Sequence, residues 1–279
     1  MPKARLFKHC GIIGRVLYYV FAFDMWSIRQ MDESIARFRD YAAAFRNGDK
    51  FCDENIELKV EHTLRVVAET RELCCAEAIP EHLAQLASYA ALLHDLSRFS
   101  QFRQSGSFND AESFDHGDRS AELAAADGWV STLAHRDAEA VLTAVCWHNK
   151  PALPDGLSPD ALTLSRIVRD ADKLDIFRVL LEHLDHPDNP AVTFSLDSSA
   201  GVTPKIAEDI AAGRQVMHRD MRSAADFTAA KLLWPFDLNF GWSRGEFLHR
   251  NYIDRLAAHL PSEPLLLRAA ERAKAHCRH

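Results

Sequence analysis

The stretch Ser88–Phe99, S-Y-A-A-L-L-H-D-L-S-R-F, decides how this chain folds, because it places a histidine and an aspartate at the end of an apolar segment. From Leu83 to Leu96, Asp95 is the only formally charged residue. An ionised carboxylate taken out of water is costly unless it is paired, hydrogen-bonded or bound to a metal. The sequence therefore predicts a buried partner for the His94-Asp95 pair.

The composition predicts one large, mostly helical domain, or one domain with an appended lobe. Of the 279 residues, 47% are hydrophobic and 26% are charged, and 11 glycines and 11 prolines are few for a chain of this length. Such a chain can bury a sizeable core. We therefore expect an all-α protein. Along the chain, the expected division is a core in residues 51–186 and a C-terminal helical region, residues 187–279, packed on that core.

The net charge and the cysteine content indicate which partners and which cell compartment we expect for the protein. The net charge of −7 argues against a nucleic-acid partner. The six cysteines include no C-x-x-C motif, and the neighbours Cys74 and Cys75 could form only a strained bridge. Reduced thiols and a cytoplasmic location are the simplest interpretation.

The N-terminal stretch M-P-K-A-R-L-F-K-H-C-G-I-I-G-R-V-L-Y-Y-V-F-A-F carries four basic residues before any acidic one. Its apolar run is interrupted by Arg15 and falls short of the roughly 20 residues that cross a bilayer, so no stable membrane span is expected. Three interpretations of this stretch stay open: an extension ahead of a start at Met25 or Met31, a docking helix, or membrane association. Residues 1–50 as a whole are treated as an N-terminal extension of uncertain status.

Helical periodicity in the first half of the chain directs several histidines inward. A helix is predicted from Asp53 to Leu73, with His62 at the edge of its apolar stripe. A second predicted helix runs from Pro80 to about Arg98, and the His94-Asp95 pair lies at its C-terminal end. After a predicted loop, a third helix opens with H-G-D-R-S-A-E-L, which begins at His116.

Two further predicted helices add a histidine and an aspartate. A helix from about Asp137 ends at His148, which shares a face with preceding valines. Ser158 and Pro159 predict the start of a long helix. Within it Asp172 is flanked by apolar residues four positions away on both sides, so it is a better candidate for an inward carboxylate than Asp170.

Imidazoles and carboxylates on successive helices are typical of a site for divalent transition metals. Mn, Fe, Co, Ni or Zn suit such ligands, whereas a magnesium or calcium site would be richer in oxygen. Six groups make two ions possible. The candidate ligands are His62, His94, Asp95, His116, His148 and Asp172.

The ordered set resembles that of the HD-domain metal-dependent phosphohydrolases, whose pattern is a histidine, a His-Asp pair and a later aspartate. Here these are His62 in V-E-H-T-L-R-V, the pair in A-L-L-H-D-L-S-R-F, and Asp172 in I-V-R-D-A-D-K-L-D. The resemblance covers about residues 55–185 and implies an HD-domain-like helical bundle with the metal site in its centre. The tail F-D-L-N-F-G-W-S-R is similar to that of some stand-alone bacterial members.

The resemblance also implies how the ligands are shared. In the two-metal branches, D-H-G-D-R-S-A-E-L and A-V-C-W-H-N-K look like the segments that hold a second ion, which gives His116 and His148. Asp95 would bridge the two ions. The cyclic-dinucleotide branch resembles H-D-I-G-K and carries a Gly-Tyr-Pro motif, but this chain reads H-D-L-S-R and has no such motif. The chain therefore departs from that branch.

The activity that the resemblance implies is hydrolysis of a phosphate ester or anhydride of a small, nucleotide-like substrate by metal-activated water. Asp95 and Arg98 are the candidate catalytic residues. Arg65, Arg169 and Lys173 are the candidates for binding the phosphate. Four phenylalanines between Phe99 and Phe114 could either cover a substrate or pack the loop onto its own domain.

Two alternatives from other classes stay open. Di-iron oxygenases of the same superfamily use the same four histidines and two aspartates, and a nucleotide- or metal-binding regulatory module would bind without turnover. Basic residues beside the ligands favour phosphate chemistry. The sequence leaves the oligomeric state open.

Overall fold

The computed structural model describes residues 30–279, apart from the side chain of His218. The chain divides after residue 44 into two units, and the described part of the first unit is a single helix over residues 30–43. The three interpretations of the apolar N-terminal stretch fall on residues 1–29, outside the described part. The predicted boundaries at residues 50 and 186 stay predictions.

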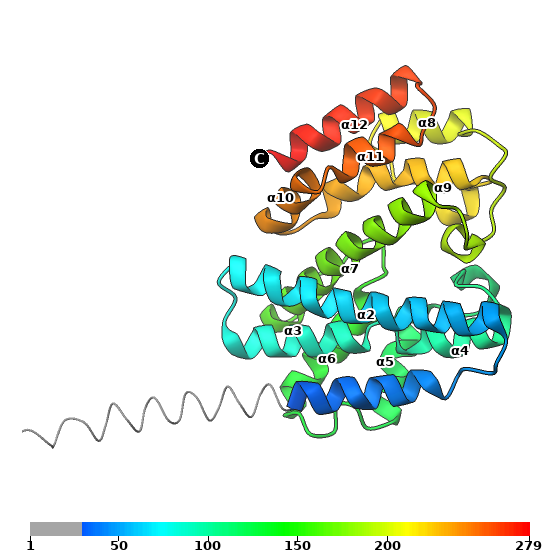
Figure 1. The fold of residues 1–279 in the computed structure, drawn as a ribbon. Helices are drawn as coiled ribbons and strands as arrows, with labels where there is room; N and C mark the ends of the chain where they lie inside the picture. Colours follow the sequence, from blue (N-terminus) through cyan, green and yellow to red (C-terminus); the bar gives the residue numbers. More distant parts are fainter. Residues whose placement is uncertain (1–29) are drawn as a thin grey trace, which may run out of the picture. The chain divides into compact units, whose positions relative to one another are not determined.

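The second unit, residues 45–279, is built from α-helices and short 3-10 helices (Figure 1), which confirms the predicted all-α class. Between residues 45 and 279 the extended structure is limited to one isolated bridge, between Asp197 and Ser223. The first six helices are α2 (Lys50–Ala76), α3 (Glu81–Leu93), α4 (Leu96–Ser105), α5 (His116–Ala126), α6 (His135–Trp147) and α7 (Pro159–Asp185). The later helices are α8 (Pro204–Ala211), α9 (Ala224–Ala230), α10 (Gly241–His249), α11 (Tyr252–Ala258) and α12 (Pro264–Cys277). The 3-10 helices are η1 (Asp110–Glu112), η2 (Pro190–Thr193), η3 (His218–Asp220) and η4 (Lys231–Asp237).

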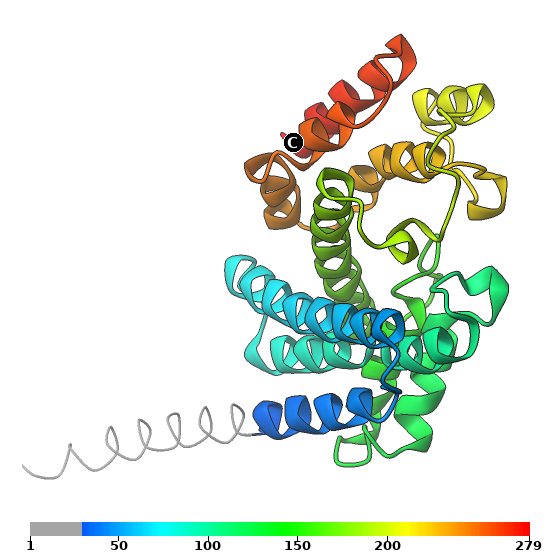
Figure 2. The same cartoon turned by 45° about the vertical axis from the view of Figure 1, so that its right-hand side comes forward.

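Helix α7 connects two groups of helices. It packs on α2, α3 and α6 in one group and on α10 and α11 in the other (Figures 1 and 2). Its start is fixed as predicted, because the Ser158 side chain accepts a hydrogen bond from the Ala161 N–H and Pro159 occupies the first turn. A helix buried along most of its length can carry side chains into the interior from both of its halves.

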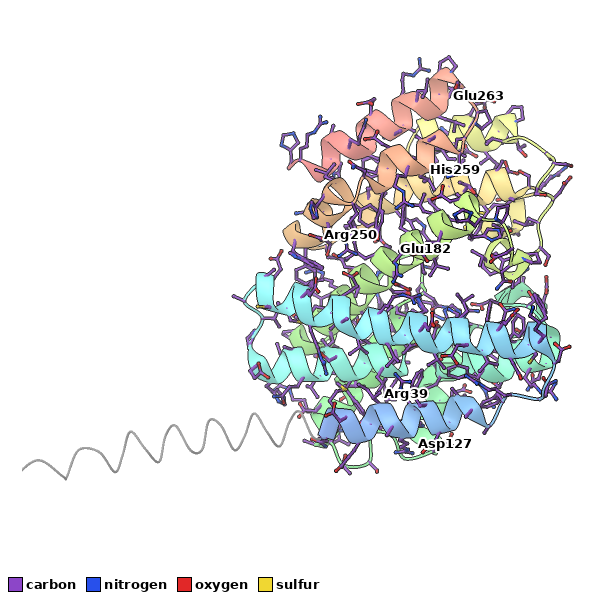
Figure 3. The ribbon with its side chains drawn as sticks, in the orientation of Figure 1. Arg39, Asp127, Glu182, Arg250, His259 and Glu263 are labelled. Atoms are coloured by element: carbon purple, nitrogen blue, oxygen red, sulfur yellow. The ribbon has the colours of Figure 1, made fainter. Side chains whose placement is uncertain are left out.

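The C-terminal helices are held to α7 by an apolar core, and polar contacts join them to α2 and α7. Leu174, Phe177 and Leu181 of α7 are fully buried in a cluster with residues of α8 to α12. Arg250, at the end of α10, makes a double ion pair with Glu69 of α2, with N–O distances of 2.5 and 2.9 Å. His259, at the end of α11, lies 2.9 Å from Asp185 of α7. Figure 3 labels Arg250 and His259 at these junctions.

The predicted helix from Pro80 to Arg98 is wrong in one respect, because it is two helices. Asp95, with φ −112° and ψ 18°, leaves helical geometry, and α4 begins at the next residue. Helix α4 then runs through the predicted loop to Ser105 and ends at Gly106, whose φ of +67° suits glycine. Phe99 and Phe102 are buried, so these rings pack onto their own domain. Because of this break, the side chains of His94 and Asp95 point in directions that one continuous helix would not give them.

No helix in residues 30–279 combines the length and the apolar composition that a bilayer crossing requires.

Candidate metal centre

The six candidate ligands meet at one place in the second unit. They come from the middle of α2, the α3–α4 junction, the start of α5, the end of α6 and the middle of α7. All six residues are buried, with exposed fractions between 0% and 8%. They are His62, His94, Asp95, His116, His148 and Asp172.

Four of these residues form a compact first group. The Nε2 atom of His62 lies 3.4 Å from Nε2 of His94 and 3.1 Å from Oδ1 of Asp172. Oδ2 of Asp95 lies 3.5 Å from Nε2 of His62 and 3.4 Å from Nε2 of His94. Metal–ligand bonds of about 2.1 Å place neighbouring ligand atoms about 3.0 to 3.4 Å apart. The spacing of the first group therefore fits one divalent ion.

The second group lies on the other oxygen of the same aspartate. Oδ1 of Asp95 lies 3.7 Å from Nε2 of His116 and 3.9 Å from Nε2 of His148, and these two nitrogens are 3.1 Å apart. His94, Asp95 and His148 also have ligand atoms close enough to share an ion. Asp95 thus directs one oxygen to each group.

The four imidazoles are oriented in the same way. Each Nδ1 donates a hydrogen bond to an oxygen: His62 to Asp175 at 2.7 Å, His94 to the Ala91 carbonyl at 2.6 Å, His116 to Asp110 at 2.6 Å and His148 to the Val145 carbonyl at 2.7 Å. A histidine held through Nδ1 leaves Nε2 free as a ligand, and such partners are typical of metal-binding histidines. Four Nε2 atoms consequently face a common centre.

Two observations fit the binding of a cation at this centre. Oδ1 of Asp172 is buried and has no hydrogen-bond partner. Burial lowers the pKa of His94, but the Asp95 and Asp172 carboxylates outweigh burial and raise that pKa to about 10. The two buried carboxylates therefore favour a positive charge in the space between them, which is the kind of charge that a metal ion would supply in place of a proton.

The surroundings keep the two histidines of the second group, His116 and His148, in the neutral form. Burial lowers the pKa of His148 well below the ordinary value, and the neighbouring His116 and His94 lower it further. Burial and Arg98 together lower the pKa of His116 against the opposing effect of Asp110. Neutral imidazole is the form that binds a metal, so both rings have the required protonation state.

The predicted basic residues differ in where the structure places them. Arg98, Arg169 and Lys173 line a cavity of about 790 Å³ that opens from the centre. Arg65 does not line it, because its guanidinium binds Asp175 through Nε at 2.6 Å and Nη2 at 3.1 Å. The expected contact of Arg65 with a phosphate is thus replaced by a salt bridge behind His62.

Three residues of the centre were not predicted from the sequence. Asp175 and Asp110 orient His62 and His116, and Lys59 donates a hydrogen bond of 2.6 Å to Oδ2 of Asp95. Burial raises the pKa of Asp95, but Lys59, His94 and Arg98 overcome burial and hold it well below the ordinary range. For Asp175, the spacing D-A-D-K-L-D was an available signal, since it lies one helical turn after Asp172.

Comparison with protein-family models finds a match to the HD domain. The HD domain family model matches residues 60–176, a range that holds all six candidate ligands. No curated protein and no solved structure matches the chain. HD domains are typically metal-dependent hydrolases. Residues 60–176 of this chain form a domain of the HD-domain superfamily.

Proposed function

We propose that the protein is a metal-dependent phosphohydrolase that cleaves a phosphate ester or anhydride of a small, nucleotide-like substrate. The observation that carries the proposal is the convergence of four Nε2 atoms on the two oxygens of Asp95, at the inner end of a cavity. In this proposal His62, His94, Asp95 and Asp172 hold one divalent ion. His116 and His148 hold a second ion, which Asp95 shares.

The bound ions would be Mn, Fe, Co, Ni or Zn. They would lower the pKa of a bound water to about 7 and neutralise charge on the phosphoryl oxygens. The residues of the chain orient and charge the ligands. The hydrogen-bond partners of Nδ1 fix the imidazole rings, and Lys59 keeps Asp95 ionised. Lys173 and Arg169 line the cavity beside the centre, and we assign them to the phosphate.

Arg98 is proposed as the cation closest to the reacting group. Its Nη2 lies 3.2 Å from Nε2 of His116, and its Nε lies 3.5 Å from Oδ1 of Asp95. The Phe108 carbonyl and Asp110 hold its Nη1 at 2.6 and 2.9 Å. A guanidinium fixed in this way can neutralise developing phosphoryl charge without reorganisation.

The experiment that tests the proposal is a screen for phosphate release. Full-length protein loaded separately with each of the five metals is incubated with nucleotides, sugar phosphates and aryl phosphates. Release is expected with one or more metals and should be lost in His94→Ala. The control is His82→Ala, because the His82 side chain is 62% exposed and contacts none of the six ligands.

Two outcomes would contradict the proposal. Oxygen consumption by the iron-loaded protein with an organic substrate, without phosphate release, would assign the same ligands to an oxygenase. Tight nucleotide binding without release under any of the five metals would assign the protein to the regulatory modules.

A further inference from the structure

The cavity extends from the metal centre to the C-terminal helices, where its wall becomes mostly apolar, with Gln215, Arg219 and Arg272 also lining it. Side chains from α7, from η2 and the residue after it, and from the segment between η3 and the end of η4 form this wall. We call this part the apolar chamber. Its main members are Val179, Val192, Phe194, Met221, Leu233 and Trp234.

Lys231, the first residue of η4, lines the same cavity. It is only 6% exposed, and its Nζ lies 3.9 Å from the centres of both the Phe227 and the Trp234 rings. Within residues 30–279 no carboxylate lies within 4.0 Å of this ammonium, and no hydrogen bond to it is formed. A buried charge held by ring faces alone is incompletely compensated.

Four other largely buried cations of the cavity already have carboxylate partners. Lys59 binds Asp95 at 2.6 Å, and Arg98 binds Asp110 at 2.9 Å. Arg169 and Lys173 share Asp237, at 2.5 and 2.8 Å. An anion entering the cavity would therefore find its least compensated buried cation at Lys231.

We propose that Lys231 binds an anionic group of the substrate, which is a phosphoryl group attached to an apolar body that occupies the apolar chamber. This inference rests on the proposed function, whose substrate class it specifies. The ammonium would form charge-assisted hydrogen bonds to phosphoryl oxygens, which are stronger than bonds between neutral groups. The two rings would hold it in position and exclude water from the contact.

The ionisation of Lys231 agrees with this role. Burial lowers its pKa to about 7, with Lys173 adding to the effect and Asp172 opposing it. A bound anion favours the charged form of a neighbouring amine. Binding would thus restore the charge that burial disfavours.

The test uses phenylphosphonate, whose carbon–phosphorus bond a phosphoesterase does not hydrolyse, so binding is measured whether or not turnover occurs. Calorimetric titration of the metal-loaded, full-length protein is compared with Lys231→Met, which keeps an unbranched side chain one atom shorter and removes the ammonium. The affinity should fall about tenfold or more. Lys205→Met is the matched control, because Lys205 is exposed and does not line the cavity.

Two further probes separate the parts of the inference. Methylphosphonate lacks the apolar body and benzyl alcohol lacks the anion, so both should bind more weakly than phenylphosphonate. Equal affinity of wild type and Lys231→Met for phenylphosphonate would overturn the assignment of Lys231. Equal affinities for methylphosphonate and phenylphosphonate would overturn the inference that the substrate carries an apolar body.

A measurement on the wild type covers the case in which Lys231→Met does not fold. Acetic anhydride labels accessible amines, and peptide mass spectrometry reports each site. Phenylphosphonate should protect Lys231 and leave the labelling of Lys205 unchanged, and absence of protection would contradict the inference. Protection without any phosphate release from aryl phosphates would instead count against the proposed function alone.

Discussion

The Nδ1 atom of His62 lies 2.7 Å from Oδ2 of Asp175, although the two residues are 113 positions apart in the sequence. Asp175 is 1% exposed and is also bound by Arg65 through two hydrogen bonds. Burial raises the pKa of Asp175, but the bonds from His62 and Arg65 lower it below the ordinary value. An ionised carboxylate behind His62 fixes the tautomer in which Nε2 faces the centre.

Replacement of Asp175 by asparagine should weaken metal binding by about 10- to 100-fold, since an amide cannot accept hydrogen bonds from both His62 and Arg65 as the carboxylate does. Calorimetric titration of the metal-free protein with Zn²⁺ or Mn²⁺ measures the effect. Glu182→Gln on the same helix is the control, because its side chain is 56% exposed. Unchanged affinity in Asp175→Asn would show that the ring of His62 is fixed by packing alone.

The two groups of ligands predict how metal content responds to mutation. Protein purified without chelator should hold about two ions per chain, and the double variant His116→Ala, His148→Ala should hold about one, since the first group stays intact. Elemental mass spectrometry measures both. His249→Ala, with a side chain that is 82% exposed, should match the wild type. Loss of all metal in the double variant would mean that the ions do not bind to separable groups.

The sequence predicted the parts of the centre that local patterns determine. Helical spacing directs His62, His148 and Asp172 inward, and the capping residues Ser158 and Pro159 start α7 where the structure has it. These signals depend on neighbours within about four positions along a helix. They hold whatever the tertiary arrangement is.

What the sequence missed depends on contacts between distant segments. Arg65 has the chemistry of a phosphate ligand, but Asp175, 110 residues later, binds it. Asp110 belongs to a short 3-10 helix, where no periodic pattern indicates the direction of a side chain. Lys231 lies in a region that showed only shorter helices, and no pattern there indicated that its side chain is buried in the wall of the cavity. Such residues are identified by the fold, not by spacing.

Gly117 lets α5 approach α6 closely at the second group of ligands. A Cβ atom at this position would lie 2.7 Å from the carbonyl oxygen of Cys146 and would also strike the Asn149 side chain. Gly117→Ala should therefore lower the free energy of unfolding by about 1–3 kcal/mol. It should also reduce the occupancy of the ion held by His116 and His148, because the helix that begins at His116 must shift.

Chemical denaturation and metal analysis of Gly117→Ala test both effects. The control is Gly245→Ala, an exposed helical position at which a Cβ would meet nothing within 4 Å. That change should leave stability unchanged or raise it by about 0.5–1 kcal/mol. Equal stability of Gly117→Ala and wild type would mean that α5 and α6 can separate at no cost.

Lys231 should make the stability of the protein depend on pH in the alkaline range. Its pKa is lowered from 10.5 to about 7 by burial, so between these values the unfolded chain binds more protons at this residue than the folded chain. The free energy of unfolding of the wild type then rises with pH over this range, by at most about 1.4 kcal/mol per pH unit. Below pH 7 the Lys231 amine is protonated in both the folded and the unfolded chain, so its contribution to the free energy of unfolding is constant.

The Lys231→Met variant has no titrating amine at this position. It also removes the free-energy cost of burying an ammonium. The variant should exceed the wild type in stability at pH 7, and its advantage should shrink as the pH rises to 10. Denaturation midpoints followed by circular dichroism at pH 7, 8, 9 and 10 measure the difference, and Lys205→Met should run parallel to the wild type. Parallel curves for Lys231→Met as well would mean that the Lys231 amine stays charged in the folded protein, held by an acceptor other than the two aromatic rings.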